Sequence, residues 1–220
     1  APEDAARTGL LAALERLAPS VGHVGLYVGL RRTAEELGLP RANLWIHRDA
    51  DHDRSFELAA RGDGPLPFAY VSFPSAKDPD FTRRHPGRAT IDVISLASYE
   101  RFRRWEALPW KKRGAEYEAL KEKLAAELLE TLYAHVPQVR GAVDVAELST
   151  PLTTRHFANA PHGEVYGLEH TPARFLERRL APRTPIRGLY LTGQDVVSCG
   201  IGGALMGGAL TASAILRRNV

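Results

Sequence analysis

The segment from Val196 to Leu216 is 21 residues long, bears no charged side chain, and contains five glycines and four alanines. A segment so poor in charge is rarely left facing water, so protein or lipid must cover it. Its length would allow it to cross a bilayer, but Gly, Ala, Ser, Thr and Cys make up more than half of it and favour membrane insertion only weakly. We therefore predict a helix over 201–218 that packs closely through small residues, with a C-terminal membrane anchor as the less favoured alternative.

The other elements of secondary structure predict an α+β fold. The clearest helix is 116–136, because apolar residues recur along it at spacings of three and four, and Pro137 ends it. Strands and helices do not alternate strictly, which favours a mixed or antiparallel sheet with flanking helices. The predicted strands are 23–30, 43–47, 68–74, 89–97, 142–150 and 188–192, and further helices are predicted over 9–17, over 98–110 and after Thr150-Pro151.

Charge and cysteine content exclude some classes of partner. The formal net charge of the 220 residues is only +3, and Lys and Arg are interleaved with Asp and Glu. Without a basic cluster or an aromatic RNA-binding pattern, we expect no nucleic-acid partner. The one cysteine, Cys199, excludes an intrachain disulfide and fits a reducing, cytoplasmic compartment.

The sequence GLYLTGQD places Asp195 just after the predicted strand 188–192, and glycines then open a helix near Gly200 to Gly203. The first turn of a helix offers unpaired N–H groups and the positive end of its dipole, and glycines let backbone approach a ligand closely. A carboxylate repels phosphate but accepts hydrogen bonds from sugar hydroxyls. This order of features indicates a cofactor that carries a polyol.

The sequence GLYLTGQDVVSCGIGGALMGGALTASAIL resembles the C-terminal flavin-binding segment of the phytoene desaturase and retinol saturase family, whose members are FAD-dependent oxidoreductases. The stretches SFPSAKDPDFTRRHPGRATIDVIS, YERFRRWEALPWKKRGAEYEALKEKL and STPLTTRHFANAPHGEVYGLEH also resemble consecutive pieces of that family. The resemblance covers most of the chain in the right order, and WKKRGAEYEALK and HGEVYGLEH narrow it to retinol saturase-like members.

The resemblance implies a fold, a cofactor and a set of site residues. Asp195 would hydrogen-bond the ribityl or pyrophosphate part of FAD, and the helix start would stabilise a reduced flavin. Gly207 and Gly208 would allow close helix packing. The whole enzyme would move a hydride between flavin N5 and a carbon–carbon bond of an apolar, isoprenoid-like substrate; no catalytic side chain is identified. The implied cofactor-binding residues are Gly193, Asp195, Gly200, Ile201, Gly202, Gly203 and Ala204, and the implied substrate-lining residues are Tyr166, Gly167 and His170.

The chain departs from the family at its N-terminal side. Residues 1–60 contain no GxGxxG motif, and the chain starts with Ala1 rather than Met. We therefore expect a fragment, with a substrate-binding region over 1–186 and the C-terminal strand and helix of the FAD-binding domain over 187–220. Its partner would be the missing N-terminal FAD-binding domain, and alone it would bind FAD weakly or not at all, be inactive, and self-associate. The alternative is a free-standing module that binds an apolar ligand without redox chemistry.

Other candidate sites are weaker. The stretch HRDADHD at 47–53 could bind a metal, but it lacks the spacing of an EF-hand, so we predict a charged loop and no metal site. The sequence contains no G-x-S-x-G motif, so hydrolase chemistry is disfavoured. Cys199 could be activated beside a helix start, although a packing role is favoured. Lys111, Lys112 and Arg113, with Trp105 and Trp110 nearby, form either a solvated loop or a peripheral membrane contact.

Overall fold

The computed structural model describes residues 9–62 and 64–220, which form two compact units. One unit consists of residues 9–21 together with Glu164–Val220, and the other is Gly22–Gly163. We call them the discontinuous unit and the sheet unit. The predicted boundary between the substrate-binding region and the FAD-binding part lies at 186/187 and does not coincide with the limits of these units. It concerns function and stays a prediction.

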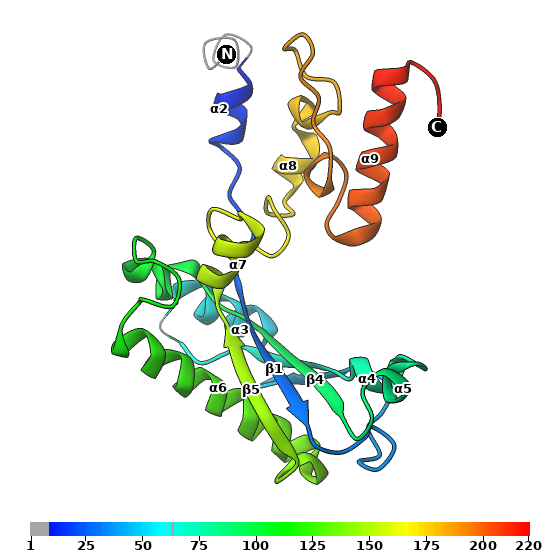
Figure 1. Ribbon diagram of the computed structural model, residues 1–220. Helices are drawn as coiled ribbons and strands as arrows, with labels where there is room; N and C mark the ends of the chain where they lie inside the picture. The colour runs from blue at the N-terminus through cyan, green and yellow to red at the C-terminus, as the bar shows by residue number, and fades with distance from the viewer. Residues whose placement is uncertain (1–8, 63) are drawn as a thin grey trace. The chain divides into compact units, whose positions relative to one another are not determined.

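The sheet unit is built on five antiparallel strands in the order β2-β3-β4-β1-β5, which confirms the predicted α+β class (Figure 1). Each strand lies within one or two residues of its predicted range, because apolar and β-branched residues alternate along most of them. The strands are β1 (His23–Leu30), β2 (Leu44–His47), β3 (Phe68–Ser72), β4 (Ala89–Leu96) and β5 (Val143–Ser149).

One face of the sheet is covered by α6 (Ala115–His135), which matches the helix predicted over 116–136 (Figure 1). Its stripe is buried, with Leu124, Leu128 and Leu132 against the inward residues of the strands. The opposite face of the sheet is rich in aromatic side chains. Trp45 lies 4.8 Å from Tyr70 and 5.4 Å from Phe68, measured between ring centroids.

The stretch 47–53, predicted as a loop, leads instead into a helix, α3 (His52–Arg61). Asp51 caps this helix by accepting a hydrogen bond from the Arg54 N–H at 3.0 Å, and Asp49 accepts one from the Asp51 N–H. The prediction missed this helix because α3 buries only Ser55 and Ala59, and two small residues do not form a recognisable apolar stripe. Among the described residues, no group of three or more His, Cys, Asp or Glu side chains is placed to hold a metal ion.

Shorter helices complete the sheet unit. The predicted helix 98–110 is reduced to two 3-10 turns, η1 (Tyr99–Arg101) and η2 (Arg103–Trp105), whereas α7 (Pro151–Ala158) begins at the predicted Thr150 cap. Thr150 and Thr153 form a reciprocal capping box there. The remaining elements are α4 (Pro74–Lys77), α5 (Phe81–Arg84) and η3 (Pro137–Val139).

The discontinuous unit joins two distant parts of the sequence. The extended segment 18–21 runs beside 165–169, with hydrogen bonds from the Val165 N–H to the Val21 carbonyl and from the Ser20 N–H to the Gly167 carbonyl. The helices of this unit are α2 (Leu10–Leu14), α8 (Pro172–Leu176), η4 (Arg178–Leu180), η5 (Gln194–Val196) and α9 (Gly200–Leu216). None of the helices in the described residues reaches the length and hydrophobicity needed to cross a membrane.

The strand predicted over 188–192 does not form. Tyr190 makes only an isolated bridge to Arg183, and the Leu191 N–H bonds to the Pro182 carbonyl. A strand requires a continuous partner, and within the described residues no other strand lies beside this segment.

Candidate functional site

All ten predicted site residues lie in the discontinuous unit. Two hydrogen bonds join the segment that holds the substrate-lining candidates to the segment that holds the cofactor-binding candidates. The Leu168 N–H donates to Asp195 Oδ1 at 2.8 Å, and the Cys199 N–H donates to His170 Nε2 at 2.8 Å. The structure therefore brings the two groups of predicted residues together.

The glycines of this region fall into two classes. Three of them are required by contacts within the protein. A Cβ on Gly203 would lie 1.8 Å from the Ser198 carbonyl oxygen, and one on Gly207 would lie 2.3 Å from the Gly193 carbonyl oxygen. A Cβ on Gly167, whose φ is +65°, would lie 2.4 Å from Asp195 Oδ1. The implied packing role of Gly207 is thus explained by the backbone that precedes α9.

The second class has no explanation in protein packing. Apart from the backbone of α9 itself, no described atom lies within 4 Å of a Cβ built on Gly202 or Gly208. The implied role of Gly208 in close packing stays a prediction, since no described atom of this chain packs against it. Gly202 lies in the first turn of α9 without a positive φ, where a glycine costs about 1 kcal/mol relative to alanine.

The N-terminus of α9 keeps polar capacity for a ligand. Cys199 occupies the N-cap position without a side-chain cap, and the Gly200 N–H makes one long bond, 3.3 Å, to Gln194 Oε1. The helix continues for 17 residues, so its dipole is well developed at this end. Ile201 is 82% exposed, and Ala204 is also exposed on the next turn.

Asp195 lies in η5 and points toward the 166–168 segment. Its side chain is 41% exposed, and the only hydrogen bond it accepts from the described residues uses Oδ1, so Oδ2 stays available to a hydroxyl donor. Gly193, with φ of +91°, precedes η5 and sets the turn that presents this carboxylate.

Sequence reasoning missed Arg174, which lies in α8 beside Asp195. Its side chain is 2% exposed, its Nη2 donates to the Gln194 carbonyl at 2.8 Å, and the same nitrogen lies 3.9 Å from Asp195 Oδ1. Its buried Nε and Nη1 have no partner among the described residues. The sequence does signal the start of α8, because Thr171 is its N-cap and Pro172 its first residue. No sequence pattern shows that the side chain of Arg174 turns inward.

A cavity of about 180 Å³ opens beside Arg174. Glu177, also at its wall, accepts a hydrogen bond from the Arg179 N–H, which lowers the pKa of the Glu177 carboxyl and keeps it charged. The cavity is lined by Arg174, Phe175, Glu177, Arg178, Leu180, Ala181, Asp195, Val196 and Val197.

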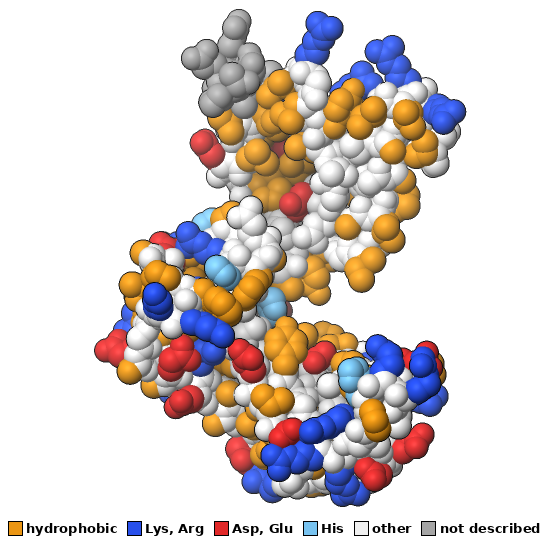
Figure 2. All heavy atoms as spheres, viewed as in Figure 1, with side chains coloured by type: hydrophobic (Ala, Val, Ile, Leu, Met, Phe, Trp, Pro, Cys, Tyr) orange, Lys and Arg blue, Asp and Glu red, His pale blue; other side chains and the backbone are white. Residues whose placement is uncertain are grey.

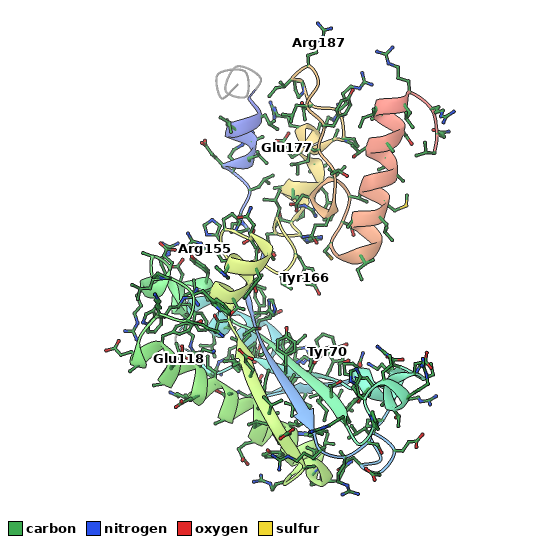
Figure 3. All side chains as sticks on the ribbon, in the orientation of Figure 1. Tyr70, Glu118, Arg155, Tyr166, Glu177 and Arg187 are labelled. Carbon is green, nitrogen blue, oxygen red and sulfur yellow. The ribbon has the colours of Figure 1, made fainter. Side chains whose placement is uncertain are left out.

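The substrate-lining candidates differ in exposure and role. Tyr166 is exposed, and its N–H bonds to Ser20 Oγ (Figure 3). His170 is held more firmly, since its Nε2 accepts from Cys199 and its ring meets Phe175 edge-on at 5.6 Å.

Comparisons with known proteins extend over nearly the whole chain. No family model matches it. It is 35% identical over 220 residues to the human (Homo sapiens) all-trans-retinol 13,14-reductase, and 37% identical over 205 residues to the Danio rerio protein of that name. These matches cover 96% and 90% of the chain but only 36% and 34% of the relatives, so the chain spans about a third of their length.

A further relative carries the word inactive in its name. The chain is 32% identical over 213 residues to a Danio rerio protein named inactive all-trans-retinol 13,14-reductase. Relatives with and without that word in their names therefore both match over this segment.

Proposed function

Because the chain belongs to the retinol saturase-like family, we propose that it is part of an FAD-dependent oxidoreductase that acts on a carbon–carbon bond of an apolar, polyene-like substrate. In this proposal the start of α9, η5 and the 166–170 segment form one side of the FAD site. The other side would come from the N-terminal FAD-binding domain, which we infer to lie outside these 220 residues.

Gly202 is the observation that most supports a cofactor at this place. A glycine in a helix is unfavourable unless something needs the room, and no described protein atom needs it here. A flat ring system lying against the first turn of α9 would need that room. The N–H groups of that turn other than that of Gly200 would then donate to an electron-rich oxygen of the ring.

Asp195 and Arg174 suit the polar part of the same cofactor. Asp195 has one oxygen committed to the Leu168 N–H and would accept a hydroxyl with the other. Arg174 positions Asp195 by holding the Gln194 carbonyl, and its guanidinium lies 3.9 Å from the Asp195 carboxylate. When bound, FAD supplies the hydride acceptor or donor, and this chain holds, orients and shields it.

Apolar surface in both units fits an apolar substrate and a missing protein partner. The open face of the sheet carries Trp45, Phe68 and Tyr70, a type of surface that takes flat, conjugated molecules. Hydrophobic side chains also recur along α9 (Figure 2), which buries only Gly207 and Thr211. We infer that the remainder of the full-length protein covers α9.

The test uses the full-length gene product that contains this chain. We expect it to purify with FAD or to gain flavin absorbance when FAD is added. Gly202→Leu should abolish that absorbance, because the side chain would fill the space beside the first turn. A full-length protein that stays colourless with added FAD would overturn the proposal.

The matched control is Gly208→Leu, two turns further along α9 and equally free of protein neighbours in this chain. Circular dichroism of the 220-residue chain should be unchanged by either substitution. FAD retained by Gly202→Leu would place the cofactor elsewhere.

A further inference from the structure

The sheet unit contains a second cavity, of about 600 Å³, far larger than the one beside Arg174. It lies between the start of α6, the β5 edge of the sheet and α7, and Glu118, labelled in Figure 3, marks that end of α6. A volume of this size is typical of sites for drug-sized ligands. The lining residues are Tyr27, Trp110, Lys111, Arg113, Tyr117, Glu118, Lys121, Glu147, Leu148, Ser149, Thr153 and Phe157.

Arg113 is the unusual member of this lining. It is 7% exposed, yet no carboxylate of the described residues lies within ion-pair distance of its guanidinium. Its Nη2 makes a single long bond of 3.4 Å to the Leu152 carbonyl, and its buried Nε has no partner among the described residues. The ring of Tyr117 lies 5.2 Å from the guanidinium carbon and stabilises the charge, but it leaves the Nε–H of the guanidinium without an acceptor. A buried charge with so few hydrogen-bond acceptors and no counter-ion is unfavourable, and an anion in the cavity would compensate it.

The other charges of the lining favour a single negative charge on the ligand. Three cations, Lys111, Arg113 and Lys121, face two acids, Glu118 and Glu147, which leaves a net charge of +1 (3 − 2). Glu118 lies 3.7 Å from Lys121 and offsets part of that lysine's charge. The N-cap of α6 is Gly114, which has no side chain to cap the helix, and Glu116 and Glu118 in the first turn already offset part of its positive end.

The remaining walls are apolar. Trp110 and Phe157 are both exposed and meet edge-on, with ring centroids 5.2 Å apart. Tyr27 is also exposed on this side of the sheet. Exposed aromatic rings beside a buried cation suit a molecule with an apolar body and one charged end.

We propose that this cavity binds the carboxylate of a long-chain, fatty-acid-like amphiphile, with its headgroup on Arg113 and its chain along Tyr27, Trp110 and Phe157. Every lining residue lies within Gly22–Gly163, so the proposal does not depend on the FAD site in the discontinuous unit.

Titration calorimetry of the 220-residue chain with dodecanoate, dodecanol and acetate tests both halves of the ligand. Dodecanoate should bind at least about tenfold more tightly than dodecanol, because a hydrogen bond between two charged groups is stronger than one to a neutral hydroxyl. Acetate, which lacks the chain, should bind at least about tenfold more weakly than dodecanoate. Equal affinity for dodecanoate and dodecanol, or no binding of dodecanoate, would overturn the proposal.

Substitutions locate the site. Arg113→Met should weaken dodecanoate binding at least about tenfold. Since Arg113 is buried, this variant could unfold, so Lys121→Gln provides a second measurement. It should weaken dodecanoate binding about two- to fivefold, as expected for a partly exposed charge. Lys123→Gln, on the same helix but outside the lining, should leave the affinity unchanged. Equal effects of Lys121→Gln and Lys123→Gln would contradict the assignment.

Discussion

The two units of this chain are held together in different ways. The sheet unit buries apolar side chains from β1, β3, β4, β5 and α6 in one continuous core, and Leu44 and Ile46 of β2 pack against it partly buried. The discontinuous unit buries few large apolar side chains among its described residues, chiefly Leu10 and Leu180. It also leaves Leu176 79% exposed and Ile201 82% exposed. The sheet unit therefore has the core of an independently stable domain, and the discontinuous unit does not.

In the discontinuous unit, backbone contacts replace side-chain packing. Protein atoms occupy the place where a side chain would lie at Gly167, Gly203 and Gly207. The Thr211 hydroxyl lies 2.7 Å from two carbonyl oxygens to which it can donate, that of Leu191 before α9 and that of Gly207 within it. Such contacts shape a turn closely but bury little apolar area, so they supply less stability. The comparison fits the proposal that this unit forms one side of a cofactor site.

The largest effect is expected from the sheet core. Leu128→Ala should lower the free energy of unfolding by about 2–5 kcal/mol, because Leu128 is fully buried between α6 and the sheet. Urea unfolding followed by tryptophan fluorescence measures this directly, since Trp45, Trp105 and Trp110 all belong to the sheet unit. Leu176→Ala, in the discontinuous unit, should change it by less than about 0.5 kcal/mol. Equal losses from the two variants would remove the contrast between the units.

A pair of glycines sharpens the contrast within the discontinuous unit. Gly203→Ala should destabilise the start of α9 by about 1–3 kcal/mol, because the new methyl group would overlap the Ser198 carbonyl oxygen. Gly202→Ala should stabilise the same turn by up to about 1 kcal/mol in the 220-residue chain. Hydrogen exchange of the α9 amides, measured by mass spectrometry, should shift in opposite directions. A shift in the same direction would show that the turn before α9 is not packed as described.

The hydroxyl of Thr150 tests the junction between α6 and α7. Its Oγ1 lies 2.7 Å from the buried Tyr117 hydroxyl and also caps α7. Thr150→Ala should therefore lower the free energy of unfolding by about 1–2 kcal/mol. Thr150→Ser keeps both hydrogen bonds and should lose less. If Ala and Ser at this position cost the same in urea unfolding, the loss comes from the methyl group and not from the hydroxyl.

The smallest effect is expected from pH. Burial lowers the pKa of His23, at the start of β1, below its usual value of 6.5. Because the unfolded chain binds the proton more readily, stability should be fully present above about pH 6.5 and decrease as the pH falls below it. His23→Gln should flatten this part of the stability–pH curve. Parallel curves for the two proteins would assign the pH dependence to other groups.

The sequence was informative where a pattern is local and repeated. The strands around β1, the stripe of α6 and the Thr150-Pro151 start of α7 all follow from spacing and capping. It was less informative for α3, which buries little, and for the strand predicted over 188–192, which has no partner to pair with. The retinol saturase-like resemblance was confirmed, while the roles of the site residues stay predictions.

What the sequence determined by itself was the α+β class and the position of the glycine-rich turn, because both depend on residues close together in the chain. Only the tertiary structure decided which glycines have protein neighbours and which face open space. It also decided that Arg113 and Arg174 are buried with unfilled hydrogen-bonding groups. These facts depend on contacts between residues far apart in the sequence, and no local pattern encodes them.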